Sequence, residues 1–196
     1  MYNSNPYGIG LAPPVTPEGR GKYAGNPIVI IGGSSSVGQN GKQLRHFTCQ
    51  KWNSPYNFSV LQLAKLSGFS PIITTASLKH TESLKYLGAT HVIDRNISAS
   101  ALAAEIANIT KNVPLKYAAD SISLADTQQV AYDLLAPGGV LATFLPVAIN
   151  TTEEKRVISA IGVIKYPSNV KLLNALFHDN FERLLKEGLV KVSKWS

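Results

Sequence analysis

Short apolar runs alternate with amphipathic stretches along most of this chain. The apolar runs are rich in β-branched residues and end at glycine, serine or acidic residues, which is typical of strands buried in a parallel sheet. They predict strands within residues 26–33, 70–77, 90–95, 115–123 and 140–146, with a sixth within 157–164. The stretches between them have helical periodicity and mostly end at glycine. They predict helices over residues 61–69, 78–89, 98–110, 124–139 and 169–188.

This alternation of strands and helices predicts the fold class. Consecutive βαβ units place parallel strands in one sheet and helices on both of its faces. We therefore expect an α/β protein with a Rossmann-type doubly wound parallel sheet. Such a sheet binds ligands outside the carboxyl ends of its strands. The loops to examine are those that follow Ile31, Thr75, Ile93, Ala119 and Phe144.

Composition narrows the possible function classes. The chain has 196 residues, 44% of them hydrophobic and 16% charged, which is enough for one sizeable globular core. A single cysteine excludes an internal disulfide. No apolar run approaches the roughly 20 residues of a membrane span, and the N-terminus lacks the apolar core of a secretory signal. We expect a soluble, cytoplasmic protein with no membrane partner.

The formal net charge of +7 raises the question of nucleic-acid binding. Residues 40–59 hold Lys42, Arg45 and Lys51 and no acidic residue, so part of the excess lies in one segment. Elsewhere charges of both signs are interspersed, as on an ordinary solvated surface. We expect no nucleic-acid partner.

The segment GGSSSVG after the first strand has the features of a phosphate-binding turn. Gly32 and Gly33 permit a sharp turn, and Gly38 permits close packing of the next helix on the sheet. The backbone amides of residues 35–37 would then face a pyrophosphate at a helix N-terminus. Ser34 occupies the second glycine position of the usual G-x-G-x-x-G pattern, so a tight turn without a ligand stays an alternative.

The end of the second strand bears on the choice of cofactor. Folds that prefer NAD usually place Asp or Glu there to hold the ribose 2′-hydroxyl. Here the segment reads TTASLKH, without an acid before Glu82. Ser77 could donate to a 2′-phosphate and Lys79 could neutralise it, which favours NADP(H). The alternative is that Ser77 caps the next helix and that Lys79 is an ordinary surface lysine.

Three stretches carry a resemblance to a known family: GKYAGNPIVIIGGSSSVGQ, LQLAKLSGFSPIITTASLKHTESLKYLGATHVID and LLAPGGVLATFLP. They resemble the cofactor-binding domain of medium-chain dehydrogenases/reductases, in particular the zinc-independent enoyl-reductase-like and quinone-reductase-like branch. The resemblance implies an NADPH-dependent oxidoreductase that acts on a small-molecule substrate with an activated C=C or C=O bond. It leaves a homo-oligomer open, and it implies no metal site.

The same resemblance implies roles for individual residues. Ser35, Ser36 and Val37 would hold the pyrophosphate, and Ser77 and Lys79 the 2′-phosphate. The loops after the fourth and fifth strands would border the adenosine and nicotinamide ends of the cofactor, through Asp120, Ser121, Phe144 and Leu145. For Phe144 and Leu145 the alternative is plain core packing. No catalytic residue is implied within this chain.

In that family a GroES-like domain precedes the nucleotide-binding fold and supplies most of the substrate pocket. This chain starts almost at the first strand. We therefore expect an irregular lead-in over residues 1–26 and an NADP-binding Rossmann domain over 27–191, in a truncated dehydrogenase without the GroES-like domain. One alternative is a non-catalytic nucleotide-binding fragment. An S-adenosylmethionine-dependent methyltransferase is less favoured, because neither of the first two strands ends in an acid.

Residues 41–59 stand where one continuous helix should follow the glycine turn. Removing Gly41–Ser59 joins the flanks into a single amphipathic helix of the length that the family has. The Gly-Lys and Ser-Val boundaries can be encoded by splice donor and acceptor sequences, and the aberrant tail 192–196 opens with a Val-Ser pair that can encode a donor. We expect two translated introns, with a genuine surface insertion as the alternative. A spliced transcript that still encodes Gly41–Ser59 would contradict this expectation.

Overall fold

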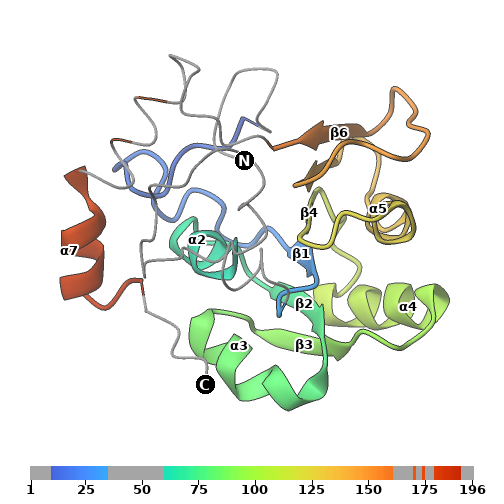
Figure 1. Cartoon of the computed structure of the whole chain (residues 1–196), viewed down its shortest axis with the longest axis horizontal. Coiled ribbons are helices and arrows are strands. Elements are labelled where there is room, and N and C mark those ends of the chain that lie inside the picture. The colour runs from blue at the N-terminus through green and yellow to red at the C-terminus, as the bar shows by residue number, and fades with distance from the viewer. Residues whose placement is uncertain (1–9, 35–59, 161–169, 171–173, 175–178, 191–196) are drawn as a thin grey trace.

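A computed structural model of the chain describes residues 10–34, 60–160, 170, 174 and 179–190. Its centre is a six-stranded sheet in which all neighbouring strands are parallel, in the order β3-β2-β1-β4-β5-β6 (Figure 1). The strand order reverses between β1 and β4, as it does in a Rossmann fold. The predicted fold class is therefore confirmed.

The strands are short, and helices lie between most of them. The strands are β1 (Ile28–Ile31), β2 (Ile72–Ala76), β3 (His91–Asp94), β4 (Tyr117–Asp120), β5 (Val140–Thr143) and β6 (Arg156–Ser159). The helices are α2 (Val60–Leu66), the short 3-10 helix η2 (Leu78–His80), α3 (Thr81–Leu87), α4 (Ala99–Thr110), α5 (Ala125–Asp133) and α7 (Phe181–Lys186). No helix among the described residues is long and apolar enough to cross a membrane.

The helices cover both faces of the sheet, as Figure 1 shows, with α2 and α3 on one side and α4 and α5 on the other. Successive side chains of a strand point to opposite faces. Ile28 and Ile30 accordingly join the core cluster with α2 and α3, whereas Val29 and Ile31 join the cluster with α4 and α5. This two-sided burial explains why β1 consists only of apolar residues.

The lead-in contains no helix or strand in its described part, yet it packs against the sheet. The ring of Tyr23 stacks on that of Phe69 with the centroids 4.8 Å apart, and both rings meet Tyr117 edge-on. The Tyr23 hydroxyl accepts a hydrogen bond from the amide of Ala12 at 2.8 Å. The Tyr23 amide donates to the carbonyl of Ser67 at 2.9 Å. The irregular lead-in is therefore part of the core near the start of β4.

Two predicted elements differ from the structure. The apolar pattern predicts the sixth strand within 157–164, but β6 begins at Arg156, whose amide donates to the carbonyl of Gly139 at 3.0 Å. The apolar pattern missed this start because the first paired residue is charged. The helix expected over 169–188 is also not continuous where the structure describes it, because Asn180 is the N-cap of α7. The predicted insertion 41–59 and the tail 192–196 lie outside the described residues, so both stay predictions.

Candidate functional site

The chain reverses its winding at the carboxyl ends of β1 and β4. The amide of Ser121 donates to the carbonyl of Ile31 at 3.0 Å, so the two strands stay paired up to this point. Beyond it, β1 continues into the glycine turn and β4 continues toward α5 on the other face. Dinucleotides bind at such a switch point. We call its two sides the β1–β2 edge and the β4–β5 edge.

The glycine turn at the β1–β2 edge is held by two buried threonines of β2. Gly32 has a left-handed φ of +73°, which side chains rarely tolerate. Its amide donates to Thr75 Oγ1 at 3.1 Å, and the amide of Gly33 donates to Thr74 Oγ1 at 3.1 Å. Thr74 Oγ1 in turn donates to the carbonyl of Ile30 at 2.7 Å. The polar groups of this turn are therefore bonded to the neighbouring strand.

The position of Gly33 leaves no room for a side chain. A Cβ atom there would collide with Thr74 Oγ1 and lie 3.2 Å from Thr74 Cβ. The predicted turn geometry is thus present up to Ser34, with the amide of Gly33 engaged by β2. The residues predicted to hold the pyrophosphate lie outside the described residues, and their roles stay predictions: Ser35, Ser36, Val37 and Gly38.

Both residues predicted to read the 2′-phosphate lie just after β2. Ser77 occupies the N-cap position of η2, yet its side chain makes no capping hydrogen bond. Lys79 lies within η2 and is exposed. The capping alternative for Ser77 therefore lacks the bond that would support it, and Lys79 is accessible to an anion.

The end of β3 adds a cation to this edge. The amide of Arg95 donates to the carbonyl of Ala76 at 3.0 Å, and its side chain is exposed. Asp94 pairs in register with Ala76, but its Oδ1 accepts the amide of Asn96 at 3.0 Å within its own loop. Arg95 and Lys79 therefore place two exposed cations around the end of β2.

The β4–β5 edge is organised by the fully buried Asp120. Its Oδ1 accepts the amide of Ile122 at 2.9 Å, and its Oδ2 accepts the hydroxyl of Thr127 at 2.7 Å. Burial raises the pKa of Asp120 above its ordinary value, and Asp126 adds to this, although hydrogen bonds from Ser123, Thr127 and Ile122 oppose it. The carboxyl group fixes the turn from β4 into α5.

Ser123 joins this turn to the loop after β5. It has a left-handed φ of +61° and is 3% exposed. Its hydroxyl donates to the carbonyl of Asp120 at 2.6 Å and accepts the amide of Phe144 at 2.8 Å. Ser121, which was predicted as a site residue, is also buried at this turn. A strained backbone held by buried hydrogen bonds is common at ligand-binding turns.

A second connection between the same loops runs through Gln128 of α5, which is completely buried. Its Nε2 donates to the carbonyls of Ser123 at 2.9 Å and Pro146 at 3.0 Å. Its Oε1 accepts the amide of Ala148 at 2.9 Å. One side chain therefore holds the loops that follow β4 and β5 at a fixed separation.

The two site residues predicted after β5 differ in their surroundings. Phe144 is half-buried and packs against the core cluster on the α2 and α3 face. Leu145 is 48% exposed, and its carbonyl accepts the hydroxyl of Thr143 at 2.9 Å. Leu145 therefore faces solvent and is available to a ligand.

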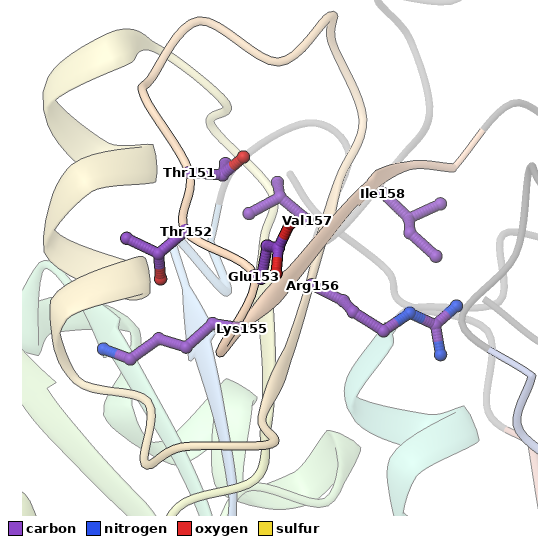
Figure 2. Close-up of a pocket in the computed structure, with 7 residues that line it drawn as sticks. All are labelled: Thr151, Thr152, Glu153, Lys155, Arg156, Val157 and Ile158. Atoms are coloured by element: carbon purple, nitrogen blue, oxygen red, sulfur yellow. The ribbon is translucent and has the colours of Figure 1, made fainter.

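A different concavity, of about 480 Å³, lies where β6 begins (Figure 2). Lys155 and Arg156 extend to opposite sides of the strand there. Lys155 Nζ donates to the carbonyl of Tyr132 at 3.0 Å, and the Tyr132 hydroxyl accepts the amide of Thr152 at 2.8 Å. This concavity lies at the amino end of the sheet, away from the edge where such folds bind cofactors.

Several site-forming residues were missed by the sequence analysis: Thr74, Thr75, Arg95, Ser123 and Gln128. Two adjacent threonines at the end of an otherwise apolar strand are a readable signal, because a buried polar side chain needs a hydrogen-bond partner. Gln128 gave no such signal, since its partner Ala148 lies 20 residues further along the chain. The described residues contain no group of three His, Cys, Asp or Glu side chains placed to hold a metal ion.

Comparison with known proteins places this geometry in a family. The sequence profile of the family described as zinc-binding dehydrogenase matches residues 58–170, which is more than half of the chain. The trans-enoyl reductase fsa3 of Fusarium sp. (strain FN080326) is 32% identical over 113 residues. These residues are 58% of this chain and 26% of that protein, so the match spans about a quarter of the relative's length.

Solved structures share the fold. The mycobacterial protein Rv1454c complexed with NADPH superposes with a TM-score of 0.62 at 17% identity, over 87% of this chain and 49% of that one. The CurK enoyl reductase gives a TM-score of 0.62 at 17% identity, over 90% and 48% of the respective chains. The chain thus spans about half of these enzymes. With its sheet order and the family profile in agreement, the chain belongs to the zinc-binding dehydrogenase family of the medium-chain dehydrogenase/reductase superfamily, within its cofactor-binding region.

Proposed function

We propose that this chain binds NADP(H) along the carboxyl edge of its sheet, as the cofactor-binding part of an oxidoreductase. The observation that carries the proposal is the end of β2, where the side chain of Ser77 makes no capping hydrogen bond and Lys79 is exposed. Arg95 adds a second cation, and no carboxylate follows β2 before Glu82. A 2′-phosphate needs donors and positive charge, whereas a ribose 2′-hydroxyl is usually held by an acid.

Different parts of the edge have different roles in this proposal. Gly32 and Gly33 shape the turn, and Ser35, Ser36 and Val37 donate their amides to the pyrophosphate, as the family resemblance implies. The family resemblance has the loops after β4 and β5 border the adenosine and nicotinamide ends, and we assign the β4–β5 edge to the nicotinamide because it lies in the second half of the two-part sheet. When bound, the nicotinamide supplies hydride for an activated C=C or C=O bond, and the protein supplies orientation.

The proposal is tested by titrating the purified chain with NADPH and with NADH. We expect tighter binding of NADPH, and we expect Lys79→Ala to weaken NADPH about tenfold, the equivalent of one charge-assisted contact. NADH affinity should not change, because NADH has no 2′-phosphate. Lys116→Ala is the matched control, since Lys116 is exposed directly before β4, at the other end of the sheet. Equal losses for both cofactors would show that Lys79 does not contact the 2′-phosphate.

Three further measurements separate the alternatives. We expect little NADPH oxidation with an enone. Holding the two reactants in the right orientation lowers the activation free energy by about 7–11 kcal/mol. The chain spans about half of the matched enzymes, so we expect it to supply only part of this effect. Deleting residues 41–59 should strengthen cofactor binding without producing turnover. Rapid turnover by the 196-residue chain would place the catalytic groups within it. Binding of S-adenosylmethionine in place of NADPH would favour the methyltransferase alternative.

A further inference from the structure

The buried side chain of Gln128 connects the two loops of the β4–β5 edge by hydrogen bonds. Gln128 has 0% exposed surface, and both ends of its amide are used. The two donors of Nε2 go to the carbonyls of Ser123 and Pro146, and Oε1 accepts the amide of Ala148. All three partners are backbone groups of the loops that follow β4 and β5.

These hydrogen bonds join the two loops through one side chain. The bond to the Ser123 carbonyl is buried, and a buried backbone group that loses its partner carries the full cost of its removal from water. The separation of the loops therefore depends on the length of the Gln128 side chain and on its position in α5. The bond from the amide of Phe144 to the Ser123 hydroxyl, at 2.8 Å, adds a second link but reaches only the start of the later loop.

These loops expose three large apolar side chains. Leu124, next to Ser123, is 56% exposed, and Leu145 and Val147, on either side of Pro146, are 48% and 41% exposed. Apolar side chains exposed at a binding edge are typical of surfaces that receive a flat ring or an apolar substrate. Gln128 fixes the carbonyls beside all three of these side chains.

We propose that Gln128 is a positioning residue for the nicotinamide half of the cofactor and has no direct effect on the adenosine half. The inference rests on the proposed function. In a two-part dinucleotide fold the adenosine lies over the strands β1 to β3, and the nicotinamide lies over the other half of the sheet. Ser77, Lys79 and Arg95 belong to the first half, and both loops held by Gln128 belong to the second.

The test compares two ligands on matched variants. Adenosine 2′,5′-bisphosphate contains the adenosine half with its 2′-phosphate, and NADPH contains both halves. In Gln128→Met, which keeps the length and loses the hydrogen bonds, NADPH affinity should fall about tenfold or more. The affinity for the bisphosphate should stay within about twofold. Calorimetric titration gives both constants.

Gln129→Met is the control. Gln129 is the neighbouring residue on α5, exposed, and its amide contacts Asp133 at 2.8 Å. Neither affinity should change in this variant. A Gln128→Met variant that loses both ligands equally, or keeps both, would overturn the proposal.

A measurement on the unaltered chain keeps the proposal testable if Gln128→Met does not fold. Hydrogen exchange of the amides of Phe144 and Ala148 should slow when NADPH binds and should not slow with adenosine 2′,5′-bisphosphate. Equal protection by the two ligands, or protection by neither, would contradict the assignment. Failure of the unaltered chain to bind the bisphosphate would instead refute the proposed function.

Discussion

The two edges at the carboxyl end of the sheet are built in opposite ways. At the β1–β2 edge the buried polar groups serve the strands themselves, because Thr74 and Thr75 hold the glycine turn. The cations Lys79 and Arg95 are exposed there, together with Leu78, which precedes Lys79. At the β4–β5 edge Asp120, Ser123 and Gln128 are buried in a network, and three large apolar side chains are exposed: Leu124, Leu145 and Val147.

This difference is the one that the proposed function requires for the two ends of a dinucleotide. A phosphorylated ribose is recognised by positively charged side chains, which can bind the phosphate while they are still exposed to solvent. A nicotinamide ring must be placed within a fraction of an ångström for hydride transfer, which needs rigid walls. The β1–β2 edge therefore supplies charge on a simple scaffold, whereas the β4–β5 edge uses buried hydrogen bonds to fix apolar surfaces.

The largest expected effect on stability comes from a substitution of Gly33 at the β1–β2 edge. Gly33→Ala should lower the free energy of unfolding by about 1–3 kcal/mol, because its Cβ would collide with the buried Thr74 Oγ1. Combining it with Thr74→Ala should give a loss smaller than the sum of the two single losses, since the colliding atom is gone. Urea unfolding of the two single variants and the double variant measures this coupling. Strictly additive losses would show that the two residues do not collide.

The two edges also differ in how far the sequence predicted them. The fold followed from local patterns, since β1 and β2 are apolar runs and the helices have clear periodicity. The β1–β2 edge was predicted for the same reason: Gly32, Gly33, Ser77 and Lys79 stand directly after strands. Each of these positions is determined by residues nearby in the chain, so it can be predicted from the sequence.

The β4–β5 edge was predicted only as loop positions. Asp120, Ser121, Phe144 and Leu145 were named because they follow strands, without any sign of what joins them. Gln128 and Ser123 could not be identified, because their partners lie about 20 residues away and depend on how α5 packs. A glutamine on a helix ordinarily faces solvent, as Gln129 does.

A smaller effect is expected when the link through Ser123 is removed. Ser123→Ala removes the acceptor of the Phe144 amide and the donor to the carbonyl of Asp120. The free energy of unfolding should fall by about 1–2 kcal/mol, typical of a buried group left without its partner. Ser159→Ala is the control, since its hydroxyl contacts the carbonyl of Leu145 in an exposed pair and should cost less than about 0.5 kcal/mol. Similar losses for both variants would mean that the buried hydrogen bonds of Ser123 stabilise the protein no more than the exposed one of Ser159.

The pH dependence of stability also distinguishes the two edges. Among the residues that the structure describes, the one buried acidic side chain is Asp120, at the β4–β5 edge. Burial raises the pKa of Asp120, so the folded protein holds this proton more tightly than the unfolded chain does. The contribution of Asp120 to the free energy of unfolding is therefore largest at low pH. It falls as the pH rises from the ordinary carboxyl value through the raised one.

Asp120→Asn should remove this dependence while keeping an acceptor for the amide of Ile122. The wild-type protein should gain stability relative to the variant as the pH is lowered, in urea unfolding across the acid range. Curves that stay parallel at all pH values would show that Asp120 has the same pKa in both states.

The smallest effect concerns the exposed cation at the end of β3. Arg95→Gln should weaken adenosine 2′,5′-bisphosphate by up to about fivefold at low salt, because exposed ion pairs contribute about 0.2–1 kcal/mol. The loss should shrink as salt is added, since screening shortens the reach of a surface charge. Arg156→Gln is the matched control: Arg156 is also exposed next to a strand end, but at the amino end of β6. If both substitutions weaken the ligand equally, the effect comes from the net charge of the protein, and Arg95 does not belong to the β1–β2 edge. If only Arg95→Gln does so, with the expected salt dependence, this edge recognises its ligand by surface charge.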